Sequence, residues 1–174
     1  FPKIINKKHF DRLLGLMDNE EIILGGSGNP STLKIEPTLV DHAVWASPLM
    51  QGEIFGPILP ILEFDDLDEV IPEVNRHPKP LALYFFTTEN DRAERILREI
   101  SFGGGCINDT VMHLASIHLP FGGVGESGMG QYHGKASFDT FSHKKSILKK
   151  SNRIDIPLRY PPHKHIDFLK MILK

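Results

Sequence analysis

The sequence is poor in cysteine, because Cys106 is the only thiol among its 174 residues. One cysteine cannot form an internal disulfide, and a Cys-rich zinc site needs several. The nine histidines include no H-E-x-x-H motif, and the one H-x-H arrangement is His163-Lys164-His165, near the C-terminus. We therefore predict a protein without a disulfide framework and without a metal site.

Long apolar runs are also missing. No stretch approaches the roughly 18 apolar residues that span a bilayer, and no segment has the pattern of a secretory signal. A hydrophobic share of 40% and a charged share of 24% are typical of a soluble globular protein, which we expect to be cytoplasmic. The sequence begins with Phe1 rather than Met, so we expect further residues upstream in the natural protein.

Net charge is small, at -2, but it is unevenly distributed. Residues 1–142 hold 11 Lys and Arg against 20 Asp and Glu, whereas residues 143–174 hold 9 against 2. Aromatic residues do not interleave with these basic charges as they do in proteins that bind single-stranded nucleic acid, so we predict no nucleic-acid partner. Two interpretations of the tail remain open: a solubilising segment, or a weak membrane-surface contact through a short amphipathic helix within 163–174.

The apolar pattern predicts alternating strands and helices. Apolar residues recur at helical spacing over 6–18, with Asn6 as the N-cap. Pro37 divides 34–40 into two edge-type segments. The near-continuous apolar run at 80–88 is typical of a strand buried on both faces of a parallel sheet. Further helices are predicted at 66–78 and 89–100, and further strands at 21–26, 56–65 and 103–109. The strand–helix alternation over 57–108 indicates an α/β fold with a parallel sheet.

A glycine-rich run from Gly123 to Gly128 matches the dinucleotide-binding pattern G-x-G-x-x-G. That motif needs a strand before it, a helix after it, and an acidic residue about 20 positions further on. Here Pro120 occupies the expected strand end, further glycines occupy the expected helix, and the distant position holds His143. We therefore predict a tight turn with another role, not a phosphate-binding loop.

Two further features could carry chemistry. Cys106 is the only candidate thiol nucleophile, and His113, His118 and His133, which lie nearby in the sequence, are conceivable bases. However, a cysteine within an apolar strand is usually an inert, buried residue. In the segment EIFGP at 53–57, Glu53 and Phe55 would face the same way if the backbone is extended. The carboxylate could then accept ribose hydroxyls while the ring packs on a flat cofactor. The alternative is a turn with an exposed Glu and a core Phe.

Taken in order, these segments resemble the aldehyde dehydrogenase superfamily. The resemblance rests on EIFGP at 53–57, Asn108, PFGG at 120–123 and SGMG at 127–130. GVGESGMGQYHGK, FDTFSH at 138–143 and RYPP at 159–162 are similar to the class 3 branch, which acts on fatty and aromatic aldehydes.

The resemblance implies a fold and an activity. Residues 1–141 would be the C-terminal part of a Rossmann-like, parallel-sheet catalytic domain. Residues 142–150 would be an edge strand for oligomerisation, and 151–174 a basic linker with a short amphipathic helix. The parent enzyme would oxidise aldehydes to carboxylic acids with NAD or NADP, through a thiohemiacetal and a thioester. The family's nucleophilic cysteine and general base would lie upstream of Phe1, so the chain alone is predicted to be inactive.

The resemblance also implies roles for particular residues. Glu53 would bind the ribose hydroxyls of the nicotinamide half of the cofactor, and Phe55 would pack near the nicotinamide. Gly52 stands where the class 3 branch often has a second acid.

For the substrate, Phe121 would line the pocket near the reacting centre and Asn108 would hold the surrounding backbone. His113 and Ile117 would line the aldehyde entrance. Residues 142–150 would pair with a partner subunit in a homodimer. The alternative function is an independent oligomerisation or interaction module derived from a dehydrogenase.

Overall fold

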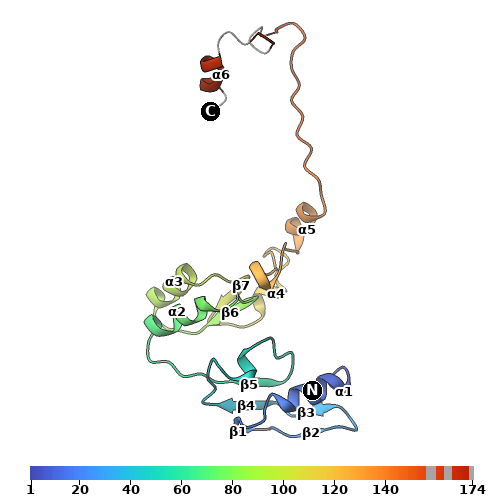
Figure 1. Ribbon diagram of the computed structural model, residues 1–174, viewed down its shortest axis with the longest axis vertical. Coiled ribbons are helices and arrows are strands. Elements are labelled where there is room, and N and C mark those ends of the chain that lie inside the picture. The colour runs from blue at the N-terminus through green and yellow to red at the C-terminus, as the bar shows by residue number, and fades with distance from the viewer. Residues whose placement is uncertain (156–159, 163–165, 173–174) are drawn as a thin grey trace.

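The computed structural model describes residues 1–155, 160–162 and 166–172. Its helices and strands form two neighbouring groups, and the C-terminal tail extends away from them (Figure 1). The first group lies within residues 1–62 and the second within residues 67–140. Each group has its own apolar cluster of buried residues, so the described chain is built around two small cores.

The first group packs helix α1 (Lys7–Gly15) against a three-stranded sheet. Asn6 caps the helix, as predicted, because its side chain accepts a hydrogen bond of 2.9 Å from the His9 amide. The buried face of the helix carries Phe10 and Leu13, at the predicted spacing. The strands are β1 (Glu21–Leu24), β4 (Thr38–Asp41) and β5 (Ile58–Pro60), and a separate pair is formed by β2 (Gly28–Asn29) and β3 (Lys34–Ile35).

The sheet order corrects one expectation. Pro37 does separate two strands, but β4 is central: it pairs with β1 in antiparallel and with β5 in parallel orientation. The edge assignment was wrong for β4, because Pro37 precedes the strand and removes no hydrogen bond from it. The ladder begins with Thr38, whose amide donates to Pro57 O at 2.8 Å.

The second group contains α2 (Leu67–Arg76), β6 (Ala82–Phe85), α3 (Asn90–Glu99) and β7 (Gly104–Ile107). Asp66 caps α2 by accepting from the amides of Asp68 and Glu69. The predicted parallel pairing is confirmed, because β6 and β7 run parallel with Tyr84 opposite Cys106. However, β5 belongs to the other sheet, so the predicted strand–helix alternation spans two sheets.

The two faces of the β6–β7 pair differ in how well they are covered. Leu83 and Phe85 pack on the cluster formed by α2 and α3. On the other face, Tyr84 keeps 37% of its surface exposed, and Phe86, just beyond the strand, keeps 62%. The predicted burial of this strand on both faces is therefore wrong, because in the described chain the ring of His113 is what packs against Tyr84.

The remaining elements are short. They are α4 (Met112–Ala115), the 3₁₀ helices at Pro48–Met50 and Gly125–Ser127, α5 (Gly134–Thr140) and α6 (Ile166–Ile172). Residues 142–150 are exposed and pair with no strand of the described chain, and Figure 1 shows them as an extended trace between α5 and α6. Among the described residues, no helix has the length and apolar character needed to cross a bilayer.

Candidate functional site

The EIFGP loop lies against helix α1. The Arg12 guanidinium donates a 2.6 Å hydrogen bond to Ile54 O, and the Ile54 side chain packs on the first core. Gly56 lies close to the fully buried Leu13, since a Cβ at Gly56 would stand 2.5 Å from Leu13 Cδ2. These contacts fix the middle of the loop and leave the side chain of Glu53 free on the surface.

Phe55 is presented outward in an unusual backbone conformation. Its φ is +50°, a left-handed value that is rare for an aromatic residue and common at ligand sites. The ring is 82% exposed, which excludes the alternative of a core phenylalanine. It borders an apolar cavity of about 630 Å³ whose other wall includes Phe1, Ile5 and His9. Because Phe55 is left-handed rather than extended, the prediction that Glu53 and Phe55 face the same way does not hold. The loop does present an exposed carboxylate and an exposed aromatic ring.

Asn108 holds the carboxyl ends of two parallel strands together. It follows β7 directly, with φ +58°, a conformation that asparagine tolerates. Its Oδ1 accepts from Thr87 N at 2.7 Å, and its Nδ2 donates to Thr87 O at 2.9 Å. Because ligands of open α/β sheets bind beyond the carboxyl ends of the strands, this end of the β6–β7 pair is the candidate substrate side.

A cluster of aromatic and imidazole rings lies near β7. His113 is 8% exposed and its ring centroid lies 5.7 Å from that of Phe121. Phe121 pairs with Tyr132 through two backbone hydrogen bonds of 2.9 Å, and their rings meet edge to face. Two predicted pocket residues, His113 and Phe121, are thus brought together, while Ile117 is 66% exposed. Tyr132 was not predicted as a site residue, because its only signal in the sequence is an aromatic residue within a glycine-rich run. Its neighbour His133 was considered only as a histidine close to Cys106 in the sequence.

Cys106 and His113 do form a pair. The thiol sulfur lies 3.6 Å from His113 Nδ1, and the buried His113 Nε2 has no hydrogen-bond partner among the described residues. Reactive cysteines are exposed and sit in electropositive surroundings. Here the thiol is half-buried, and within the described residues no lysine or arginine hydrogen-bonds it. The arrangement favours a structural cysteine.

The glycine-rich run forms a tight turn. Residues Gly125–Ser127 make a single 3₁₀ turn, without the strand and helix that a dinucleotide-binding loop requires. The predicted tight turn is confirmed. A Cβ at Gly123 would stand 2.1 Å from Ser127 O, so only glycine allows the backbone to approach this closely.

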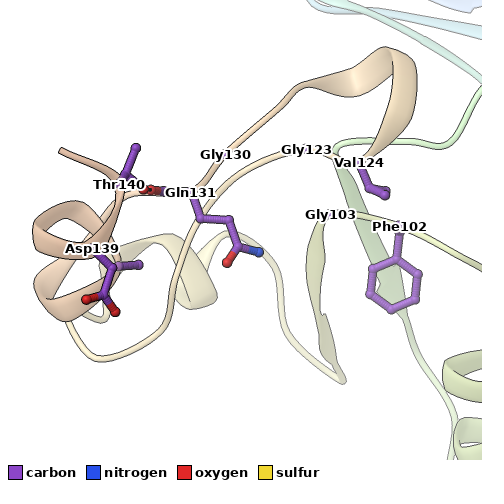
Figure 2. A pocket seen from close by; sticks show the side chains of 9 residues that line it. Phe102, Gly103, Gly123, Val124, Gly130, Gln131, Asp139 and Thr140 are labelled. Atoms are coloured by element: carbon purple, nitrogen blue, oxygen red, sulfur yellow. Dashed lines mark hydrogen bonds between the residues drawn. The ribbon is translucent and has the colours of Figure 1, made fainter. Parts of the chain in front are cut away.

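Beside this turn lies a cavity of about 610 Å³. Figure 2 shows the Gln131 side chain between Asp139 on α5 and the backbone at Gly103. A hydrogen bond from Lys135 holds the pKa of Asp139 below its ordinary value of 3.8. Gly103 precedes β7, so this cavity lies at the amino end of the strand, away from Asn108.

The two parts of the candidate site are not in mutual contact. In the part of the chain that the structure describes, no hydrogen bond, ion pair or ring contact links Glu53 or Phe55 to Asn108 or Phe121. Among all residues that the structure describes, no group of three or more His, Cys, Asp or Glu side chains could hold a metal ion.

Comparison with known proteins identifies related chains. The family model described as "Aldehyde dehydrogenase family" matches residues 3–147. The chain is 51% identical over 166 residues to 4,4'-diaponeurosporen-aldehyde dehydrogenase of Staphylococcus aureus, covering 94% of this chain and 36% of that protein. It is 48% identical to human aldehyde dehydrogenase family 3 member B1, covering 92% and 35%. It is 46% identical to the rat "Aldehyde dehydrogenase, dimeric NADP-preferring", covering 93% and 36%.

Solved structures agree with these relatives. The substrate-bound state of Staphylococcus aureus AldH superimposes with a TM-score of 0.86 at 50% identity, covering 99% of this chain and 38% of that one. A Mycobacterium tuberculosis aldehyde dehydrogenase complexed with NAD+ gives a TM-score of 0.73 at 28% identity, covering 86% and 32%. The chain thus spans about a third of the length of these proteins.

Proposed function

The chain belongs to the aldehyde dehydrogenase family, and we propose that it is the C-terminal part of an NAD(P)-dependent enzyme that oxidises aldehydes to carboxylic acids. The observation that carries this proposal is the family match over residues 3–147 in a chain about a third as long as its relatives. Its similarity to family 3 members, at 48% identity to the human protein, supports a class 3 enzyme.

We assign the cofactor contact to the EIFGP loop. The Glu53 carboxylate would accept hydrogen bonds from the ribose hydroxyls, and the exposed Phe55 ring would pack near the nicotinamide. The residues fit such a group, because Glu53 has no hydrogen bond or ion pair in the described chain and Phe55 borders an apolar cavity. When bound, the cofactor accepts the hydride that leaves the substrate.

We assign the aldehyde pocket to the less covered face of the β6–β7 pair, where His113 packs against Tyr84 and Gly104. Phe121 would line it near the reacting centre, with His113 and Ile117 toward the entrance. Asn108 would keep the loop after β7 in place through its two bonds to Thr87. These residues orient and shield a substrate, but none of them is a nucleophile.

The chain alone should therefore be inactive, because the nucleophilic cysteine and the general base would lie upstream of Phe1. NADH formation from a medium-chain aldehyde should be absent for both the 174-residue chain and its Cys106→Ala variant. Activity that disappears only in Cys106→Ala would make Cys106 the nucleophile and contradict this assignment. An upstream polypeptide that restores turnover when added to the chain would support it.

A homodimer through residues 142–150 is also proposed. This segment is extended and exposed, with Ile147 at 75% and Leu148 at 96% exposure. An extended segment with free backbone groups can add as a strand to the sheet of another chain. The rat relative described as dimeric supports this. The full chain should elute as a dimer in size-exclusion chromatography, and a chain ending at Phe141 as a monomer. Equal sizes would contradict the proposal.

The alternative function is an independent oligomerisation module. A defined dimer of the 174-residue chain that forms without NAD and gains no activity from any upstream polypeptide would favour it.

A weak membrane-surface contact by 163–174 is a further proposal. It is supported by the exposed apolar side chains on α6, which are Ile166, Phe168 and Met171. Pelleting with anionic liposomes should weaken in a chain ending at Pro162, and equal pelleting would contradict that contact.

A further inference from the structure

We propose that Arg12 is a positioning residue for the nicotinamide cofactor, acting through the backbone between Glu53 and Phe55. The inference rests on the proposed function of the EIFGP loop, and it adds a residue from a helix that precedes this loop by about 40 positions in the sequence.

The loop has a single hydrogen-bonded tether. On one side, Gln51 N bonds Pro48 O at 3.4 Å, and on the other, Thr38 N bonds Pro57 O at 2.8 Å. Between them, in the described chain, the only hydrogen bond to residues 52–56 is the one from Arg12 to Ile54 O. A change at Arg12 therefore removes the only directional contact that holds this segment.

The position of that tether determines what it controls. The Ile54 carbonyl and the Phe55 amide belong to one planar peptide unit, so holding the carbonyl direction restricts ψ of Ile54 and φ of Phe55 together. That φ is +50°, which an aromatic residue avoids when nothing constrains it. Without the guanidinium, the peptide plane can rotate, and rotation returns Phe55 to negative φ and reorients its ring relative to Glu53.

Arg12 is suited to this task by its place on α1. The next residue, Leu13, is fully buried and packs against Gly56, so α1 and the loop are already in register. Arg12 has no ion-pair partner among the described residues, and its Nη2 is the atom that donates to the carbonyl. A lysine would keep the charge and a donor but on a flexible stem without the rigid guanidinium, so it should replace Arg12 only in part.

The test uses the complete enzyme that contains these residues, with four variants. Arg12→Met removes the donors, Arg12→Lys keeps one, and Glu53→Gln reports on the proposed ribose contact. Arg92→Met is the matched control, because Arg92 forms an ion pair at the surface with Glu89 and with no other residue that the structure describes. Arg12→Met should raise the KM for NAD by about ten-fold or more, as expected for a hydrogen bond to a charged group, with a much smaller change in the KM for the aldehyde.

The outcomes separate the two proposals. A KM for NAD that is unchanged in Glu53→Gln would contradict the proposed role of the loop, and the positioning role with it. A raised KM in Glu53→Gln but not in Arg12→Met would overturn the role of Arg12 alone. If both act on one geometry, the double variant should lose less than the product of the single losses. Arg12→Met could lower the midpoint of thermal unfolding more than Arg92→Met does, and the Arg12→Lys variant then gives the answer. If the KM for NAD of Arg12→Lys equals that of the unaltered enzyme, a guanidinium is not needed at this position.

Discussion

Replacing Asn108 tests how the candidate substrate side is held together. Its side chain makes two hydrogen bonds to Thr87, and its backbone has φ +58°. Each hydrogen bond contributes a net of about 0.5–1.5 kcal/mol, and a left-handed φ costs an alanine about 1–2 kcal/mol. Asn108→Ala should therefore lower the free energy of unfolding by about 2–5 kcal/mol. Asn108→Gly loses the same bonds without the conformational cost, so it should be milder by about 1 kcal/mol.

Asn108→Asp separates the two hydrogen bonds. The carboxylate keeps the acceptor for Thr87 N, but it loses the donor to Thr87 O and places an oxygen against that carbonyl. We expect a loss of about 1–3 kcal/mol, because a carbonyl is left unpaired beside a charge. Urea unfolding of the 174-residue chain, followed by circular dichroism, measures the series. An alanine variant as stable as the glycine variant would refute the role given to φ, and losses below about 0.5 kcal/mol would refute the role given to the hydrogen bonds.

Two other perturbations test the second group. Gly105→Ala should abolish the pairing of β6 with β7, because the new Cβ would stand 2.0 Å from Leu83 O. The urea midpoint of unfolding should therefore fall steeply. In the control Gly15→Ala the new Cβ has no atom within 4 Å, so the midpoint should stay nearly unchanged. A hydrogen bond from Arg95 holds the pKa of Glu99 below its ordinary value of 4.5, so this contact stabilises the fold above that pH and is lost as the pH falls. The loss of stability between about pH 6 and about pH 3 should therefore be smaller in Arg95→Gln, and an unchanged loss would contradict the assignment.

Local signals made the helices predictable from the sequence. The cap residues Asn6 and Asp66 and the apolar spacing of Phe10 and Leu13 each report on their own turn of helix. The strand order was less accessible. Nothing near Pro37 shows that β4 is flanked by two strands, because one of them, β5, lies about 20 residues further along the chain. The apolar run at 80–88 predicted a strand correctly, but the burial of its faces depends on what packs against them.

The candidate site divides in the same way. The EIFGP and PFGG segments were found because their letters are adjacent, and the family comparison agrees with the resemblance they carry. Arg12 was missed because it is an ordinary exposed residue on a helix, and its partner is a backbone carbonyl 42 positions later. Tyr132 was missed because its contact with Phe121 depends on how the glycine turn closes.

Both parts of the candidate site share one structural feature. Phe55 and Asn108 each have a left-handed backbone conformation, and each lies beside a hydrogen bond from a side chain to the main chain. A strained peptide held by a directional contact keeps its shape before a ligand arrives, which lowers the cost of ordering it on binding. The two strained peptides belong to different cores and share no contact in the described chain. Each part of the site can therefore be shaped by its own group of elements. Loss of the Arg12 hydrogen bond should impair binding of the cofactor more than that of the aldehyde, and loss of the Asn108 hydrogen bonds should do the reverse.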